Sequence, residues 1–351
     1  MEIKKILSEA AVQKASDIHL VFGLPPMIRK DGELAVFMSS TGQALPAVAD
    51  IDLDQAMKSL LDLSQRQRFE EDKDLDAAAS IDEYRYRLNF SYDRGHIKLA
   101  ARVVDSHKPT LEEIGMPESV RHLLDLPQGL ILVTGPTGCG KSATLAAMIN
   151  HINQERSCHI ITLEDPIEYL FTSDKSVISQ RQLGEDMVSF SEGLKHCLRQ
   201  DPDVIMVGEM RDLETISTAI TLAETGHLVL ATLHTFNSAQ TIDRIIDTFP
   251  ADQQSQIRSQ LSMILAGVIS QRLLARQSGG RIAAREVMLK NSAISNLIRE
   301  NKIAQIKTVL ETNIQNGMTT LDRHLKQLYQ AGEISKETAL EYIEEASFLE
   351  S

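Results

Sequence analysis

The segment that most constrains this chain is residues 135–142, Gly-Pro-Thr-Gly-Cys-Gly-Lys-Ser, which match G-x-x-x-x-G-K-[ST] at every fixed position. A continuous apolar run at residues 130–133 precedes it, and residues 143–152 follow with helical spacing. A glycine-rich turn between a buried strand and a helix points several backbone N–H groups inward, and the helix N-terminus adds positive partial charge. The segment therefore predicts a loop that binds the phosphates of a nucleoside triphosphate.

The whole loop and the residue after it are assigned to nucleotide binding: Gly135, Pro136, Thr137, Gly138, Cys139, Gly140, Lys141, Ser142 and Ala143. Lys141 is expected to contact the β- and γ-phosphates of ATP, and the Ser142 hydroxyl to ligate Mg²⁺. The alternative is a glycine-rich turn with an ordinary surface lysine, which does not account for the agreement of loop, strand and helix. Cys139 occupies a variable position of the pattern, so no chemistry is assigned to its thiol.

Apolar runs recur after the loop, at residues 160–163, 204–207 and 228–231, with helical stretches between them. Such runs are typical of strands buried on both faces of a sheet. Strands that alternate with helices predict an α/β fold with a parallel sheet and helical crossovers. The last hundred residues have mostly helical spacing, and we expect them to be nearly all helical.

The first hundred residues have a different pattern, which predicts a small α+β unit with an amphipathic helix followed by short strands. Residues 106–117 contain two prolines and a glycine, which favours a domain boundary there. We therefore divide the chain into an N-terminal domain at residues 1–105, a linker at 106–120, an ATPase core at 121–290 and a helical C-terminal region at 291–351.

Acidic residues follow two of the predicted buried strands. Glu209 comes after residues 204–207, and Gly208 stands where such strands usually carry a first carboxylate. Glu209 is expected to polarise the attacking water. Glu164 and Asp165 follow residues 160–163 and are expected to supply charge on the Mg²⁺ side, through water, with Glu164 the next candidate for activating water. The alternative for each acid is a helix cap or a solvated loop.

His234 follows another predicted strand and could sense the γ-phosphate, contact a neighbouring subunit, or be an ordinary core or surface histidine. Arg85 and Arg87 lie two residues apart in an alternating segment, and Arg102 lies in its predicted partner strand. Like charges on one sheet face are unfavourable unless an anion faces them. These arginines either reach the triphosphate or lie on an exposed sheet face.

Composition narrows the functional classes. The net charge of −13 argues against sequence-independent nucleic-acid binding, and aromatic residues make up only 4%, with no tryptophan to stack on bases. No apolar run approaches the ~18 residues of a membrane span. Residues 1–8 contain no apolar core of a secretion signal, and the three cysteines have no CxxC spacing, so we expect a cytoplasmic protein.

With these motifs placed, the chain resembles the secretion ATPase superfamily and, within it, the type IV pilus retraction ATPases (the PilT family). The resemblance extends along almost the whole chain. It rests on ASDIHL at residues 15–20, GLPPMIR at 23–29, the phosphate loop, EDPIE at 164–168 as the acidic box, DPDVIMVGEMRD at 201–212 as the Walker B region, and ETGHL at 224–228 through LHT at 233–235 as the histidine box.

The resemblance implies a PAS-like N-terminal domain, a RecA-like P-loop ATPase domain and a ring of six subunits. It also implies Mg²⁺-dependent ATP hydrolysis that drives pilus retraction and twitching motility. The partner would be an inner-membrane pilus platform protein, which alone would hold the ring peripherally at the inner face of the cytoplasmic membrane. Arg85, Arg87 and Arg102 match the arginines through which the first domain of this family contacts nucleotide.

The branch of the family is indicated by two features. Pilus extension and type II secretion ATPases usually carry an extra N-terminal domain and a four-cysteine zinc motif, whereas this chain begins with the PAS-like segment. Residues 293–300, AISNLIRE, resemble the AIRNLIRE motif of the retraction branch, with Ser295 in place of arginine. Extension, type II secretion, a regulatory nucleotide-binding module and a nucleic-acid translocase remain as alternatives.

Overall fold

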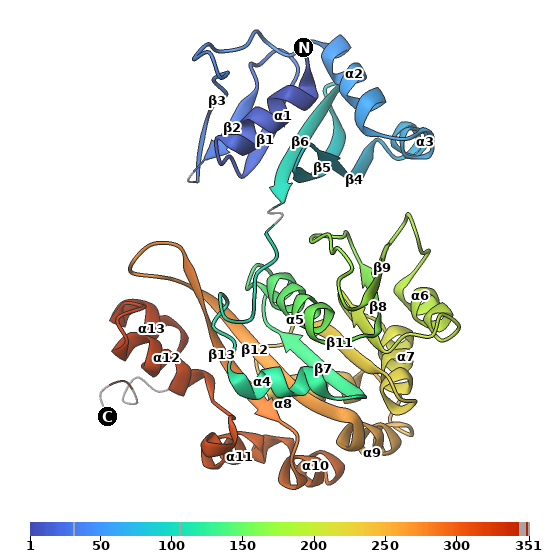
Figure 1. The fold of residues 1–351 in the computed structure, drawn as a ribbon, viewed down its shortest axis with the longest axis vertical. Helices are drawn as coiled ribbons and strands as arrows, with labels where there is room; N and C mark the ends of the chain where they lie inside the picture. Colours follow the sequence, from blue (N-terminus) through green and yellow to red (C-terminus); the bar gives the residue numbers. More distant parts are fainter. Residues whose placement is uncertain (31, 105–106, 344–348, 350–351) are drawn as a thin grey trace. The chain divides into compact units, whose positions relative to one another are not determined.

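The computed structural model describes residues 1–30, 32–104, 107–343 and 349. The chain divides into two compact units (Figure 1). The first comprises Met1–His107 with the short segment Pro166–Leu170, and the second comprises Lys108–Asp165 with Phe171–Ser351. Residue 31, residue 106 of the predicted linker and the end of the predicted C-terminal region lie outside the described residues.

The first unit is an antiparallel sheet of six strands in the order β3-β2-β1-β6-β5-β4. Its elements are α1 (Ile3–Val12), β1 (Asp17–Leu20), β2 (Met27–Lys30), β3 (Glu33–Val36), α2 (Asp50–Leu60), α3 (Leu63–Asp72), β4 (Asp74–Ile81), β5 (Tyr84–Asp93) and β6 (His96–Val104). The predicted helix and the predicted pairs of strands are confirmed, whereas α3 and β4 were not predicted. Helix α1 buries an apolar stripe that includes Ile6, Leu7 and Ala10.

The second unit is built on a sheet of seven strands in the order β13-β12-β7-β11-β10-β8-β9. The strands are β7 (Gly129–Thr134), β8 (His159–Glu164), β9 (Val177–Gln182), β10 (Val204–Val207), β11 (Leu228–Leu233), β12 (Leu265–Ala275) and β13 (Arg281–Leu289). Every neighbouring pair is parallel except β12 and β13. The four strands predicted from apolar runs are confirmed.

Helices lie on both faces of this sheet (Figure 1). The helices of this unit are α4 (Glu118–Arg121), α5 (Lys141–Glu155), α6 (Phe190–Cys197), α7 (Leu213–Glu224), α8 (Ser238–Asp247), α9 (Gln254–Ile264), α10 (Ser292–Arg299), α11 (Ile306–Thr312), α12 (Leu321–Gln330) and α13 (Lys336–Tyr342). Alternate residues of β7 enter opposite cores: Leu130 and Leu132 belong to the core with α7, and Ile131 and Val133 to the core with α5. This explains the continuous apolar run of β7, because both of its faces are covered.

The prediction that the last hundred residues are nearly all helical is wrong. Strands β12 and β13 form a long hairpin there, with Gly279 and Gly280 at positive φ in its turn. Polar residues interrupt the apolar pattern of these strands, and four of them are buried: Ser270, Gln271, Arg285 and Glu286. The sheet is therefore mixed rather than purely parallel, with β13 as its antiparallel edge.

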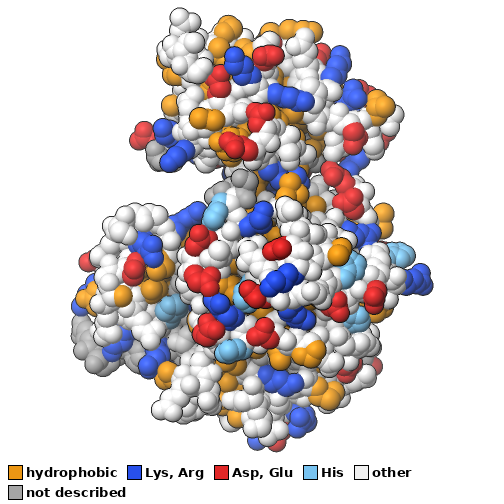
Figure 2. Space-filling view, viewed as in Figure 1, with side chains coloured by type: hydrophobic (Ala, Val, Ile, Leu, Met, Phe, Trp, Pro, Cys, Tyr) orange, Lys and Arg blue, Asp and Glu red, His pale blue; other side chains and the backbone are white. Residues whose placement is uncertain are grey.

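Acidic and basic side chains are interspersed on the face of the molecule drawn in Figure 2. Among the residues that the structure describes there is no helix with the length and apolar character needed to cross a bilayer.

Candidate nucleotide-binding site

Three neighbouring strands bring the predicted site together at one edge of the sheet. Leu233 at the end of β11 pairs with Thr134 at the end of β7, and Ala231 pairs with Val207 at the end of β10. The loop after β7, His234 after β11 and Glu209 after β10 therefore leave the sheet side by side. Ligands of parallel α/β sheets bind at this carboxyl edge of the strands.

The phosphate loop has a backbone that only glycine accommodates at several positions. Gly138 has φ +78° and Gly140 has φ +89°, in the left-handed region. Gly135 has φ +144°, and a Cβ atom there would lie 2.4 Å from the carbonyl oxygen of Gln271 and 2.6 Å from the Cys139 sulfur. The glycines of the motif thus permit both the curl of the loop and its close approach to β12.

Lys141, His234 and Glu209 form a chain of contacts. The Lys141 ammonium lies 3.5 Å from His234 Nδ1, and His234 Nε2 lies 3.4 Å from Glu209 Oε2. An ammonium can only donate, so Nδ1 accepts and Nε2 carries the proton that it donates to Glu209. The structure brings together these three predicted residues, which are separated by up to 93 positions in the sequence.

Burial affects the titration of two residues in the loop. It lowers the pKa of Lys141, and the nearby Cys139 and Glu209 counteract only part of this effect. The Lys141 ammonium also donates to the carbonyl oxygens of Gly135 at 2.8 Å and Pro136 at 3.1 Å. Burial raises the pKa of the Cys139 thiol, which disfavours the reactive thiolate.

Gly208, which stands in place of a first carboxylate after β10, packs closely against the end of β8. Its N–H donates to the carbonyl of Leu163 at 2.8 Å, and its own carbonyl accepts from the Thr232 hydroxyl at 2.5 Å. A Cβ atom at Gly208 would lie 3.2 Å from the Leu163 oxygen and 3.5 Å from the Glu164 Cα. A side chain at residue 208 would therefore require a small shift of the end of β8.

The acidic box at the end of β8 contains one buried acid, Glu164, and two exposed acids, Asp165 and Glu168. Glu164 is 8% exposed, and its Oε1 accepts from the Thr162 hydroxyl at 2.7 Å and from the Gln180 amide at 3.0 Å. Asp165 is exposed, and Ser142 lies exposed in the first turn of α5. Hydroxyl and carboxylate oxygens are the hard ligands that Mg²⁺ prefers, so the donor types of these residues suit a magnesium ion.

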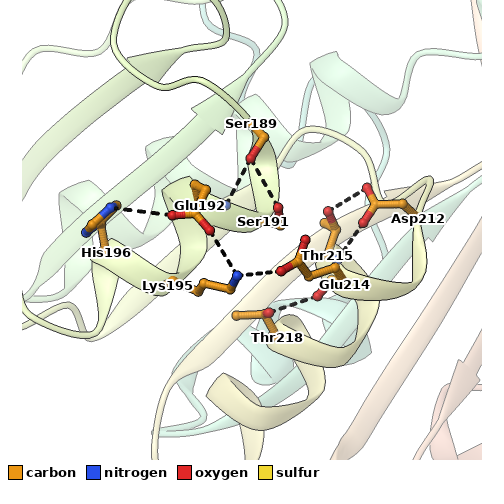
Figure 3. A network of polar contacts seen from close by, with 9 residues as sticks. All are labelled: Ser189, Ser191, Glu192, Lys195, His196, Asp212, Glu214, Thr215 and Thr218. Carbon is orange, nitrogen blue, oxygen red and sulfur yellow. Dashed lines mark hydrogen bonds and ion pairs between the residues drawn. The ribbon is translucent and has the colours of Figure 1, made fainter.

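A polar network on α6 and α7 supports the segment that carries Glu209 (Figure 3). Asp212 caps α7 by accepting from the Thr215 N–H at 2.8 Å and from its hydroxyl at 2.7 Å. The Lys195 ammonium on α6 contacts Glu214 on α7 and also Glu192, at 2.9 Å. Residues 208–212 are therefore held at one end by β10 and at the other by a capped helix.

The predicted arginines share one face of the sheet in the first unit. Arg87 pairs directly with Arg102 across β5 and β6. Arg102 contacts Asp17 at 2.8 Å, and Arg87 contacts Asp76 at 3.6 Å. Burial alone would raise the pKa of Asp17, but hydrogen bonds from Arg102 and Ser16 lower it. Asp17 and Asp76 therefore offset the positive charge of Arg102 and Arg87 on the sheet face where the sequence predicted three clustered arginines.

Arg85 is half-buried on β5, and its Nε donates to the carbonyl of Ile167 at 3.3 Å, within the same compact unit.

Sequence reasoning missed Gln271, whose amide contacts the phosphate loop. Its Nε2 donates to the Cys139 carbonyl at 2.7 Å, and its Oε1 accepts from the Thr144 hydroxyl at 2.9 Å. The available signal was three consecutive polar residues, Ser270 to Arg272, inside an otherwise apolar run.

Comparison with known proteins shows the family of the chain. The sequence model of the family described as "Type II/IV secretion system protein" matches residues 1–341. The chain belongs to this family. Within the secretion family, it is 46% identical over 343 residues to the type IV pilus retraction ATPase PilT of Pseudomonas aeruginosa, covering 97% of this chain and 98% of that protein.

A second curated protein and a solved structure indicate the same relationship. A twitching motility protein of Neisseria gonorrhoeae is 43% identical over 340 residues, which cover 96% of this chain and 89% of that one. The crystal structure of the pilus retraction motor PilT with bound ADP superposes with a TM-score of 0.92 at 44% identity, covering 100% of this chain and 99% of that one. This member of the secretion family is an ATPase of the PilT type.

Proposed function

We propose that the chain is the motor of type IV pilus retraction: a ring of six subunits that hydrolyses ATP with Mg²⁺ and thereby drives twitching motility. The observation that carries the proposal is the meeting of Lys141, His234 and Glu209 at the carboxyl edge of the sheet. That arrangement supports ATP hydrolysis. The likeness to retraction ATPases along nearly the whole chain supports the biological role.

Each residue of the site has a distinct task. The loop and Lys141 bind the phosphates, and Glu209 orients and polarises the attacking water. His234 lies between Lys141 and Glu209, where a change at the γ-phosphate reaches both. Ser142 would hold Mg²⁺, with Glu164 and Asp165 acting through water, and the ion would neutralise charge on the phosphates.

We interpret the first unit as a PAS-like domain and the second as a RecA-like ATPase domain, with Arg85, Arg87 and Arg102 contacting the nucleotide. The partner is an inner-membrane pilus platform protein, so the ring works in the cytoplasm and meets the membrane only through that partner. The acidic net charge of −13 supports a motor that acts on protein rather than on nucleic acid.

Lys141→Ala tests the proposal. Its loss removes the cation that contacts the phosphates, so ATP turnover of the purified protein should fall by about 10²-fold or more. In the host cell, the variant should leave pili extended that no longer retract, when fluorescently labelled pili are followed by microscopy. Normal retraction in cells whose protein has lost turnover would exclude this chain as the motor. Lost assembly of pili would instead indicate the extension branch.

A further inference from the structure

Gln271 is a buried amide whose two ends are both used by the phosphate loop and its helix. The side chain is 1% exposed and lies on β12. Ser270, the preceding residue, pairs with Thr134, so Gln271 lies beside Gly135, where the loop begins. Buried amides are costly unless they are hydrogen-bonded, and here both bonds go to the nucleotide-binding segment.

The orientation of the amide follows from its partners. A backbone carbonyl can only accept, so the amide nitrogen must face the Cys139 oxygen, at 2.7 Å. The Thr144 hydroxyl, in the first turn of α5, donates to Oε1 at 2.9 Å. Gln271 therefore joins the last part of the loop to the start of the helix, and Gly140 lies between the two bonds.

The bond to Cys139 fixes a peptide plane that matters for phosphate binding. In a trans peptide, the carbonyl and the following N–H point in opposite directions. Because the Cys139 carbonyl points toward Gln271, the Gly140 N–H points away from β12. Loops of this kind bind phosphate through their N–H groups, so Gln271 determines where one of these donors is aimed.

The main chain of Gln271 also restricts the loop, at its other end. A Cβ atom at Gly135 would lie 2.4 Å from the Gln271 carbonyl oxygen, and one at Gly140 would lie 3.4 Å from the amide Nε2. One residue of β12 thus contacts the beginning and the end of the loop. The loop has little freedom to shift along β12 while these contacts hold.

We propose that Gln271 is a positioning residue of the phosphate loop, which aims the Gly140 N–H at the phosphates and sets the affinity for nucleotide. The inference rests on the nucleotide-binding role of the loop given above. It assigns no contact between Gln271 and the nucleotide, since the residue acts through Cys139 and Thr144. A merely structural role in β12 would predict lower stability without a specific loss of nucleotide affinity.

Three variants and one control separate these possibilities. Gln271→Met keeps a similar unbranched shape and loses both hydrogen bonds. Gln271→Glu loses the donor to Cys139 and places an acceptor against its carbonyl. Thr144→Val removes only the second bond. Ser270→Ala is the control, because Ser270 is equally buried on β12 but bonds to Thr134 in the sheet, at 2.8 Å.

The measurements are the thermal midpoint, the Kd for ADP and for ATP with Mg²⁺, and KM and kcat for hydrolysis. Gln271→Met should weaken nucleotide binding about tenfold, the order expected for the loss of a buried hydrogen bond. Its KM should rise by a similar factor while kcat at saturation changes much less. Gln271→Glu should bind nucleotide more weakly still. Thr144→Val should bind more weakly than wild type but more tightly than Gln271→Met.

Ser270→Ala should lower the thermal midpoint by an amount similar to Gln271→Met and leave the Kd within about twofold of wild type. If Gln271→Met and Ser270→Ala lose stability equally and bind nucleotide equally, Gln271 has only a structural role and the inference is wrong. The binding assay uses purified protein and nucleotide alone. A wild-type chain that binds nucleotide but retracts no pilus would therefore overturn the proposed function without affecting this result.

Discussion

Glu209 has two neighbours that differ in what they contribute. Arg211 contacts Oε1 at 2.5 Å, but the arginine side chain is 75% exposed, where ion pairs contribute little. His234 contacts Oε2 and links the carboxylate to Lys141 in the phosphate loop. The contact through His234 is the one that joins Glu209 to the loop, so it would link the proposed water activation to the proposed phosphate binding.

Glu209→Gln should keep ATP binding and lose hydrolysis. The amide preserves the shape of the side chain but cannot take a proton from water, which typically costs 10²–10⁴-fold in rate, to order of magnitude. Binding is measured with ATP and Mg²⁺, and turnover by phosphate release. Arg211→Ala is the matched control, because it removes a partner of Glu209 without removing the carboxylate. Hydrolysis by Glu209→Gln within a few-fold of wild type would shift the water-activating role to Glu164.

Strand β13 shows how the C-terminal helices are joined to the sheet. On its outer edge, Val287 and Thr319 exchange backbone hydrogen bonds at 2.9 and 3.0 Å. The Arg285 N–H donates to His324 Nδ1 at 2.9 Å, which is shorter than the 3.3 Å from Nδ1 to the Arg285 carbonyl. We therefore assign Nδ1 as an acceptor on a neutral ring. Helix α12, which carries His324, covers an edge that would otherwise be unpaired.

The stability of the protein should fall as the pH falls from about 6.5 toward 4, in part because of His324. Burial, with a smaller effect of the Arg285 charge, lowers the pKa of this histidine from 6.5 to about 4. A lowered pKa in the folded state stabilises the protein above the unfolded pKa, and this contribution is lost as the unfolded state binds the proton. Its full size is about 3 kcal/mol at most.

The measurement is the free energy of unfolding at pH 7.5, 6 and 5, for wild type and His324→Gln. Glutamine can still accept from the Arg285 N–H but takes no proton in this range. The difference between the two proteins isolates His324 from carboxylates that titrate at lower pH. If the free energy of unfolding changes with pH by the same amount in both proteins, His324 is not held neutral by the fold.

The three apolar residues of α10 at helical spacing, Ile294, Leu297 and Ile298, form a stripe that is only partly buried. In α10, Ile294 and Ile298 are each 1% exposed, whereas Leu297 is half-buried at the margin of the same core. Truncation to alanine costs ~2–5 kcal/mol for a fully buried leucine, so that range does not apply to Leu297. The stripe anchors α10 through its two isoleucines.

The elements that could be predicted are those whose environment leaves a simple pattern. Strands β7, β8, β10 and β11 are buried on both faces, so their residues are almost all apolar. Strands β12 and β13 escaped prediction because buried polar residues break their pattern. Gln271 is satisfied by the loop, and Glu286 accepts from the Ser238 N–H and hydroxyl, both at 2.7 Å. These partners are distant in sequence, so no local pattern shows them.

The residues of the candidate site also divide into those that a local pattern indicates and those that depend on distant partners. The positions of the loop and of Glu209 at the carboxyl edge of the sheet could be predicted, because each comes one residue after an apolar run. Gln271 could not be predicted, because its role depends on β12 lying beside β7, a pairing between residues about 135 positions apart. Helix α3 was missed for a different reason. It buries only Phe69, so its sequence has almost no periodic pattern of apolar residues.

The whole chain contains two compact units, and the proposed ring requires that several copies act together. The rate of ATP hydrolysis per subunit should therefore rise with protein concentration and level off when rings are complete. Sedimentation measured over the same concentrations should show assembly in the same range. Lys141→Ala serves as the control for contaminating ATPase. A rate per subunit that stays constant while the sedimenting species changes would show that each subunit hydrolyses ATP alone.

The covered edge of β13 also matters to anyone who shortens this protein. A chain cut near residue 313 would keep the phosphate loop, Glu209 and Gln271, yet it would lose Thr319 and α12 from the outer edge of β13. The bared strand includes the apolar residues Ala283, Ala284, Val287 and Met288, and its N–H and C=O groups would be free to recruit a second copy. Such a fragment would be expected to collect in inclusion bodies despite an intact active site. The C-terminal segment with Thr319 and α12 therefore protects the edge of the sheet from pairing with another copy.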